Sequence, residues 1–179
     1  RDPSGNVLPE KRVGTFFLRG PSTMKGYDGL PEETADVLDE QGWLNTGDLG
    51  YLSDEEIVIT GRAKDLIIMN GRNIWPQDIE WSVERDISLC RTGDVSAFSV
   101  QNGNDETIVV LVQCRATSTE ARESLRTEIE RVISGVHGLQ CQVVLVPHNS
   151  LPHTSSGKLS RTKSRIQYLD GTIAELSAT

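Results

Sequence analysis

Three short polar segments of this 179-residue chain have residue types and spacings that could support chemistry. The first, at residues 45–48, reads Asn-Thr-Gly-Asp. A carboxylate that follows a glycine turn, here Asp48, could accept hydrogen bonds from two vicinal hydroxyls, such as those of a ribose. Asp48 could equally complete the turn, because Asp bonds readily to nearby backbone groups. Residues 45–48 alone leave both interpretations open.

The second segment is charged and reads Gly-Arg-Ala-Lys-Asp at residues 61–65. Arg62 could donate hydrogen bonds to hydroxyls or to phosphate, because its guanidinium holds several donors in one plane. Farther along, Gly71 opens the run Gly-Arg-Asn-Ile-Trp-Pro. A glycine at that position allows a tight turn or lets another chain approach the backbone. The alternative for this whole region is a solvated, charged linker.

The third segment, residues 151–159, reads Leu-Pro-His-Thr-Ser-Ser-Gly-Lys-Leu. It is not a phosphate-binding P-loop, because the GxxxxGK[ST] spacing is absent and Leu159 replaces the hydroxyl that would bind Mg²⁺. His153 lacks a catalytic or metal-binding partner in the sequence and is interpreted as a surface residue. The segment therefore predicts a flexible polar loop that presents Lys158 just before a helix.

The overall composition is typical of a globular protein and disfavours two classes of partner. The net charge of −8 argues against nucleic-acid binding, because neutralising phosphates requires a basic face. It does not exclude a small anion such as ATP, which responds to local charge. No apolar run reaches the roughly 18 residues of a membrane span, so none is predicted.

Cysteine usage and the start of the sequence predict a cytoplasmic location. The three cysteines show no CxxC or metal-ligand spacing, and Cys114 and Cys141 are predicted core thiols because they lie in apolar runs. This usage suits a reducing compartment. The polar opening, Arg-Asp-Pro-Ser, lacks a signal-peptide pattern. Because an initiator Met is absent, we expect a piece of a longer protein.

The predicted secondary structure changes in character near residues 61–65. Residues 1–60 are expected to be β-rich, with strands at 15–18 and 57–60, a short helix opened by Pro31, and turns at Gly42 and Gly47. A segment of this length is expected to bury too little surface for a core of its own.

Residues 66–179 predict the order β-α-β-β-α-β-loop-α. The expected elements are strands at 66–69, 95–100, 107–112 and 141–146, and helices at 76–85, after a capping box at 117–120, and from about Ser160. The turn-rich residues 101–105 indicate an antiparallel hairpin. The central helix should bury one apolar stripe, namely Ala121, Leu125, Ile129, Val132 and Val136. An antiparallel sheet covered by helices, of the α+β class, is the predicted fold.

Taken in order, the three polar segments resemble the last three conserved blocks of the adenylate-forming superfamily. That superfamily contains acyl-CoA synthetases, nonribosomal-peptide adenylation domains and luciferases. The resemblance covers essentially the whole chain. The sequence of residues 64–80 looks most like that of the fatty acyl-AMP ligases, which load acyl groups onto acyl carrier proteins rather than onto coenzyme A.

The resemblance implies a role for each matching residue. Asp48 would hold the ribose hydroxyls of ATP, and Arg62 would contact the same ribose or the phosphates. Lys64 would occupy the hinge about which a C-terminal domain rotates. Gly71 would lie where the thiol or the carrier approaches, and Lys158 would be the catalytic lysine of adenylation. No metal ligand is implied in this chain.

The resemblance also implies how the chain is divided and what it lacks. Residues 1–60 would be the tail of a large N-terminal domain, residues 61–65 a hinge, and residues 66–179 a mobile lid. The phosphate loop, the adenine pocket, the acyl tunnel and the Glu ligand of Mg²⁺ would all lie upstream. Fatty acid, ATP and Mg²⁺ would thus be handled by the parent protein, and the fragment alone is expected to be inactive.

Two alternatives remain open at this stage. The chain could be the C-terminal part of a fatty acyl-CoA synthetase, with coenzyme A in place of a carrier protein. It could also be a docking module that binds a carrier without chemistry. The presence of Asp48, Arg62 and Lys158 disfavours the docking module, which would need none of the three.

Overall fold

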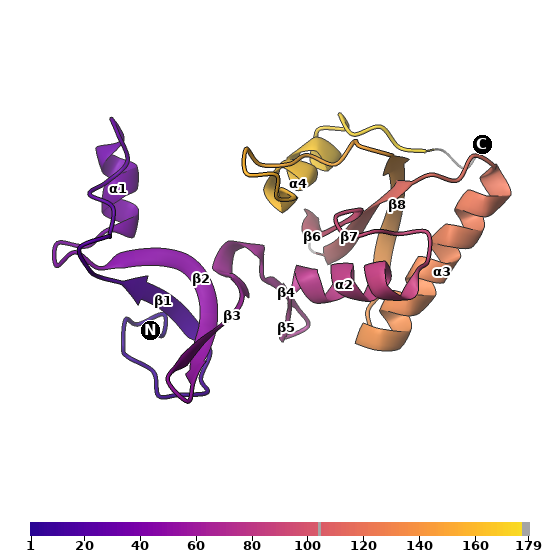
Figure 1. Cartoon of the computed structure of the whole chain (residues 1–179). Helices are drawn as coiled ribbons and strands as arrows, with labels where there is room; N and C mark the ends of the chain where they lie inside the picture. The colour runs from indigo at the N-terminus through magenta and orange to yellow at the C-terminus, as the bar shows by residue number, and fades with distance from the viewer. Residues whose placement is uncertain (104, 177–179) are drawn as a thin grey trace. The chain divides into compact units, whose positions relative to one another are not determined.

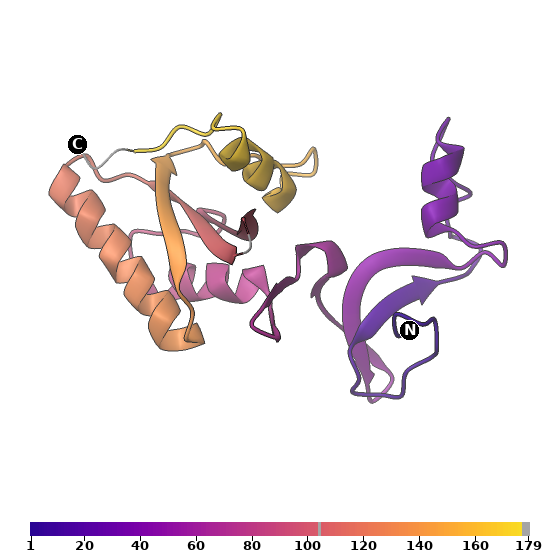
Figure 2. The ribbon, with the colours of Figure 1, turned by 180° about the vertical axis from the view of Figure 1, so that it is seen from behind.

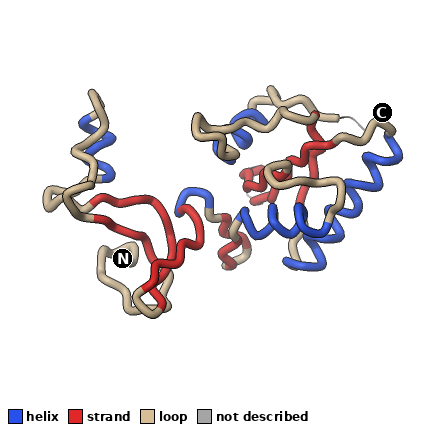
Figure 3. Tube along the Cα trace, viewed as in Figure 1, coloured by secondary structure: helices blue, strands red, loops and turns tan. Residues whose placement is uncertain are grey.

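The computed structural model describes residues 1–103 and 105–176, and the chain forms two compact units, residues 1–66 and 67–179 (Figure 1). Helices and strands alternate with turns in both units (Figure 3). The α+β class predicted from the sequence is confirmed. No helix in the described part of the chain is long and apolar enough to cross a membrane.

The first unit is a three-stranded antiparallel sheet in the order β1-β2-β3. Its elements are β1 (Gly14–Leu18), α1 (Pro31–Val37), β2 (Leu44–Ser53), β3 (Glu56–Arg62) and the 3₁₀ turn η1 (Ala63–Asp65). The strands expected at 15–18 and 57–60 and the helix opened by Pro31 are present. The turn expected at Gly47 is instead an irregularity inside β2, where the pairing register with β1 shifts between Thr15 and Phe17.

Very little of the first unit is buried. Within residues 1–66, all of which the structure describes, Gly50 alone falls in the buried class. A side chain there would collide with the neighbouring strand, because a Cβ would lie 2.1 Å from the carbonyl oxygen of Val58. Large apolar side chains stay exposed, among them Val7 (85%) and Ile57 (58%). The unit has a sheet but no closed hydrophobic core.

The second unit contains a small hairpin, a three-stranded sheet and three helices. Its elements are β4 (Ile67–Met69), β5 (Arg72–Ile74), α2 (Pro76–Asp86), β6 (Val95–Asn102), β7 (Asp105–Cys114), α3 (Thr119–His137), β8 (Cys141–Pro147) and α4 (Arg161–Leu169). This is the predicted order with β5 added. The predicted β6–β7 hairpin is antiparallel, whereas β8 pairs with β7 in parallel. A parallel pair needs a crossover connection, and α3 supplies it.

The sheet of the second unit is covered on both faces (Figures 1 and 2). One apolar cluster joins α2 and α3 to alternate sheet residues such as Val110 and Val112. The other joins the intervening positions, such as Val109 and Leu111, to Leu151 and Tyr168 on the α4 side. Both faces are therefore dry, which explains why residues 108–112 form a continuous apolar run.

Helix α3 differs in detail from its predicted pattern. Its N-cap is Ser118, whose hydroxyl accepts a hydrogen bond from the backbone N–H of Ala121 at 3.2 Å. The buried positions are Leu125, Ile129 and Ile133, while Ala121 and Val136 at the ends of the predicted stripe are exposed. At about 1.5 Å per residue the helix is roughly 28 Å long, longer than a seven-residue strand of about 23 Å such as β8.

The cysteines follow the burial pattern expected of core thiols, with one difference. Cys114 is buried, as predicted, and so is Cys90, whereas Cys141 is only half-buried. Burial raises the pKa of the Cys90 thiol to about 12 and that of Cys141 to about 11. Both thiols are therefore protonated and unreactive near neutral pH.

Candidate functional site

Asp48 and Arg62 lie opposite each other on adjacent strands of the first unit. They are paired in the register of β2 and β3, and Arg62 Nε donates to Asp48 Oδ1 at 3.1 Å. The two side chains are 33% and 56% exposed, so the pair faces solvent and contributes little to stability. An accessible carboxylate beside a guanidinium can accept from hydroxyls and donate to an anion at one place.

Local hydrogen bonds hold the backbone around Asp48 in shape. Thr46 Oγ1 donates to the carbonyl of Phe16 at 2.9 Å and accepts from the Asp48 N–H at 3.1 Å. The Gly47 N–H donates to Asn45 Oδ1 at 2.9 Å, and Gly47 has a φ of 71°. These hydrogen bonds hold the irregular part of β2 that carries Asp48, at the place where the sequence predicted a turn.

Lys64 lies in η1, directly before the boundary between the two units at residues 66 and 67. Its side chain is exposed. The flanking residues Arg62 and Leu66 have extended backbone conformations, so the 3₁₀ turn is a short interruption between extended segments. This position is compatible with the hinge expected from the sequence.

Gly71 is the second residue of the tight turn that joins β4 to β5. Asn70 and Gly71 have φ values of 51° and 73°, and Met69 pairs with Arg72 across the turn. A two-residue Asn-Gly turn with both φ positive is the preferred connection of a hairpin. The glycine is exposed, and a Cβ there would meet no atom within 4 Å. The tight turn is thus present, and space for an approaching group remains beside it.

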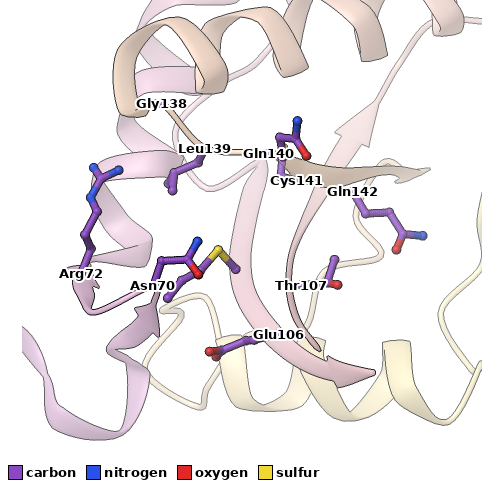
Figure 4. Close-up of a pocket in the computed structure, with 10 residues that line it drawn as sticks. Asn70, Arg72, Glu106, Thr107, Gly138, Leu139, Gln140, Cys141 and Gln142 are labelled. Carbon is purple, nitrogen blue, oxygen red and sulfur yellow. The ribbon is translucent and has the colours of Figure 1, made fainter. Parts of the chain in front are cut away.

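A surface pocket adjoins this turn (Figure 4). Asn70 and Arg72 of the β4–β5 hairpin line one side, and Leu139 and Cys141, near the start of β8, line the other. Arg72 also donates through Nη2 to the carbonyl of His137 at 3.2 Å. The hairpin is therefore tied to the C-terminal end of α3.

Lys158 lies on a turn that is closed by backbone hydrogen bonds. The Thr154 N–H donates to the Lys158 carbonyl at 2.7 Å, and the Lys158 N–H donates to Thr154 Oγ1 at 3.2 Å. Gly157 has a φ of 79° and donates to the Thr154 carbonyl at 2.9 Å. The side chain of Lys158 is exposed and forms no ion pair with the described residues. The main chain of this loop makes more hydrogen bonds than its polar composition suggested.

His153, interpreted as a surface residue, is exposed. Its Nδ1 donates to the Leu151 carbonyl at 2.9 Å, in the tautomer that carries the proton on that nitrogen. The residue forms a β-bridge with Leu159 across the base of the turn. It therefore acts within the loop, and the surface interpretation is confirmed.

Sequence reasoning missed one pair that bears on this loop, Glu80 and Arg161. Arg161 Nε lies 2.7 Å from Glu80 Oε1, and Arg161 Nη2 lies 2.6 Å from Glu80 Oε2, so the contact is bidentate. The two side chains are 7% and 24% exposed. A buried carboxylate needs a partner, so a Glu in the apolar face of α2 was a usable signal, but the sequence could not say which cation meets it.

The chain does not provide a magnesium site of its own in the part that the structure describes. No group of three or more His, Cys, Asp or Glu side chains there is arranged to hold a metal ion. The carboxylate of Asp48 is already paired with Arg62. The residues present therefore do not fit Mg²⁺, and no step of the chemistry is derived through that ion.

No family model matches the chain, but individual relatives place it in a family. A Caulobacter vibrioides protein provisionally named an acyl-CoA synthetase is 51% identical over 98% of the chain, which covers 31% of that protein. The medium-chain-fatty-acid–[acyl-carrier-protein] ligase JamA of Moorena producens is 36% identical over 93% of the chain, which covers 30% of it.

A solved structure agrees with these sequence relatives. A chain from a study of fatty acyl-adenylate ligases of E. coli and L. pneumophila superposes with a TM-score of 0.85 at 40% identity. The match covers 96% of this chain and 30% of the other. The chain belongs to the adenylate-forming superfamily of acyl-CoA synthetases and fatty acyl-AMP ligases and corresponds to their C-terminal part. It spans about a third of the length of these relatives.

Proposed function

We propose that this chain is the C-terminal part of an ATP-dependent fatty acyl-AMP ligase that passes its acyl group to the phosphopantetheine thiol of a carrier protein. The observation that carries the proposal is Lys158, an exposed cation on a turn closed at Thr154. Family membership and the Asp48–Arg62 pair support it. In this account residues 1–60 complete a larger N-terminal domain, residues 61–65 form the hinge around Lys64, and residues 66–179 are the lid.

In the first half-reaction a fatty carboxylate attacks the α-phosphorus of ATP. The new bond gives acyl-AMP, and pyrophosphate leaves. Two anions must approach each other, and the ammonium of Lys158 would screen their repulsion and stabilise the charge that builds on the phosphoryl oxygens. A point charge on a flexible stem suits this role, because the lysine must leave before the second step.

Asp48 and Arg62 would bind the nucleotide in the same half-reaction. The carboxylate of Asp48 accepts from the two ribose hydroxyls, and Arg62 donates to the ribose or the phosphates. The 3.1 Å bond between them aligns the carboxylate before the nucleotide arrives. The side-chain entropy lost on ordering Asp48 and Arg62 is therefore already lost in the free protein, so it does not weaken nucleotide binding.

In the second half-reaction a thiol attacks the acyl carbon of acyl-AMP. A thioester forms, AMP leaves, and the thiol proton passes to solvent or to a base outside this chain. The lid would rotate about Lys64 and present its Gly71 face, which is a hinge-type conformational cycle. The open space beside Gly71 would admit the narrow pantetheine arm.

Coenzyme A is the second candidate acceptor. It is favoured by the 51% identity to a protein named as an acyl-CoA synthetase, whereas the relative named as a carrier-protein ligase is 36% identical. Both acceptors end in the same phosphopantetheine thiol, so Gly71 and Lys158 would serve either. The choice concerns only the group that carries the thiol.

Acyl-AMP formation tests the proposed function. A full-length ligase that contains this chain should release pyrophosphate and form acyl-AMP, detected by mass spectrometry, with ATP and a fatty acid. It should then acylate a holo carrier protein faster than coenzyme A. The isolated 179-residue chain should do neither. Pyrophosphate release by the isolated chain, or no acyl-AMP from the full-length ligase with any fatty acid, would contradict the proposal.

A further inference from the structure

The residue that follows the Lys158 turn into α4 is anchored to two other elements of the same unit. Arg161, the first residue of α4, makes two hydrogen bonds to Glu80 of α2. The backbone N–H of Ala97 in β6 donates to the same Glu80 Oε1 at 3.0 Å. One carboxylate therefore links α2, β6 and the start of α4.

This link is buried and directional. Glu80 is 7% exposed, so its charge depends on Arg161 for compensation. A bidentate guanidinium–carboxylate contact fixes both the distance and the relative plane of the two groups. Buried ion pairs add little stability compared with apolar residues of similar size, and in some proteins they select one arrangement of the chain. The arrangement selected here is the position of the chain just after Lys158.

The turn's own hydrogen bonds do not fix that position. They join Thr154 to Gly157 and Lys158, within the turn. At the base of the loop, the Ser160 N–H donates to the Pro152 carbonyl at 2.9 Å, which closes one strand of the loop on the other. These bonds shape the loop. On its C-terminal side, Leu159 packs against an apolar cluster of the sheet, and the Arg161–Glu80 ion pair attaches the start of α4 to α2.

We infer that Glu80 and Arg161 are positioning residues that aim Lys158 for the adenylation half-reaction. The inference rests on the function proposed above for Lys158. Loss of the pair would let the start of α4 shift and carry the lysine away from the reacting phosphate. A displacement of about 1 Å is enough to cost on the order of 10²-fold in rate. Thioester formation does not use Lys158, so it should be spared.

The test separates the two half-reactions in a full-length ligase that contains this chain. Arg161→Met should lower acyl-AMP formation on the order of 10²-fold, while transfer from supplied acyl-AMP to the thiol changes by less than about threefold. Arg161→Lys keeps the positive charge but loses the planar, two-pronged donor geometry of the guanidinium, and it should give an intermediate loss of adenylation. Glu80→Gln keeps an oxygen for the Ala97 N–H, and serves as a milder variant if Arg161→Met fails to fold.

The chain offers a matched control in Arg115. Arg115 makes a bidentate contact of 2.6 and 3.1 Å with Asp94, and the two side chains are 29% and 5% exposed. Arg115 also lies 3.0 Å from His148, at the start of the same loop, so its loss disturbs the loop far from Lys158. Arg115→Met should slow both half-reactions by the same factor.

Lys158→Ala, measured in parallel, distinguishes the failure of the inference from the failure of the proposed function. If Lys158→Ala forms acyl-AMP like the wild type, the role of Lys158 is wrong. If Lys158→Ala loses adenylation alone but Arg161→Met, Arg161→Lys and Glu80→Gln leave both half-reactions intact or slow them equally, positioning by this pair is wrong. Selective loss of adenylation in these three variants, with equal slowing in Arg115→Met, supports the inference.

Discussion

Each unit of this chain contains an Arg–carboxylate pair, and the two pairs differ in burial because the units bury different amounts of surface. In the first unit, Asp48 and Arg62 pair at a solvent-facing edge and remain available to a ligand. In the second, Glu80 and Arg161 are enclosed between helices and sheet and act on the chain around them. In the proposed account, the accessible pair binds the nucleotide, whereas the enclosed pair orients the chain that follows Lys158.

The largest expected contrast between the units is in independent folding. Residues 67–179 bury two apolar clusters, whereas residues 1–66 bury Gly50 only. Expressed separately, the second unit should unfold in one cooperative thermal transition followed by circular dichroism. The first should show no transition, because a 66-residue segment with its apolar side chains exposed cannot offset its chain entropy. A cooperative transition in residues 1–66 alone would contradict this account of the first unit.

A matched pair of isoleucines measures the same contrast within one protein. Ile129 is 0% exposed in α3, and Ile57 is 58% exposed in β3. We expect Ile129→Ala to lower the free energy of unfolding by about 2–5 kcal/mol through lost burial and a cavity. Ile57→Ala should stay within about 0.5 kcal/mol in the 179-residue chain. Chemical denaturation monitored by tryptophan fluorescence and by circular dichroism checks both values.

The sequence was sufficient where local signals agree with tertiary packing. The apolar runs of β6 and β7, the Asn-Gly turn at Gly71 and the proline that opens α2 each act over a few residues, and each was predictable. Strand β2 was not predicted, because Gly47 and Gly50 interrupt its apolar pattern. Gly47 adopts a positive φ next to Asp48, and Gly50 packs too closely on β3 to carry a side chain. The three-residue β5 is too short for any periodicity.

Long-range pairing accounts for the rest of what could not be predicted. The parallel direction of β8 depends on where α3 delivers the chain. The Glu80–Arg161 contact joins residues 81 positions apart, and nothing in either local sequence identifies its partner. The candidate site residues were chosen from their order along the chain, whereas the Glu80–Arg161 contact near the Lys158 loop is visible only in three dimensions.

The exposed pair should affect ligand use more than stability. In the full-length ligase, Asp48→Ala removes charge-assisted hydrogen bonds worth about 1.5–3 kcal/mol each. We expect ATP use, measured as kcat/KM for ATP, to fall on the order of 10- to 100-fold per bond lost, since about 1.4 kcal/mol corresponds to tenfold. Fatty-acid binding and the melting temperature should change little. Unchanged kinetics with ATP would leave Asp48 as a turn residue only.

The smallest expected effect is a decrease in the folding stability of the second unit at acidic pH. Burial acts to raise the pKa of Asp94, but its bonds to Arg115, the Arg91 N–H and Gln113 outweigh burial and lower it below 3.8. A carboxyl whose pKa is lowered on folding adds stability above its unfolded pKa and loses it as the pH falls through the folded pKa. Stability should therefore decline below about pH 3.8, by at most about 1.4 kcal/mol per pH unit for this group.

Unfolding of residues 67–179 at several acidic pH values measures this dependence. Asp94→Asn removes the titrating group and should flatten the curve between pH 4 and the folded pKa. An unchanged slope in that variant would assign the acid sensitivity to other carboxyls.

The central claim is that Lys158 acts in adenylation and not in transfer, and separate measurement of the two half-reactions tests it most directly. In the full-length ligase, Lys158→Ala should lower acyl-AMP formation on the order of 10²–10³-fold, the cost of losing one stabilising charge. Transfer of supplied acyl-AMP to the thiol should continue. If Lys158→Ala forms acyl-AMP within about threefold of the wild type, roughly 0.65 kcal/mol in the barrier, the account is contradicted.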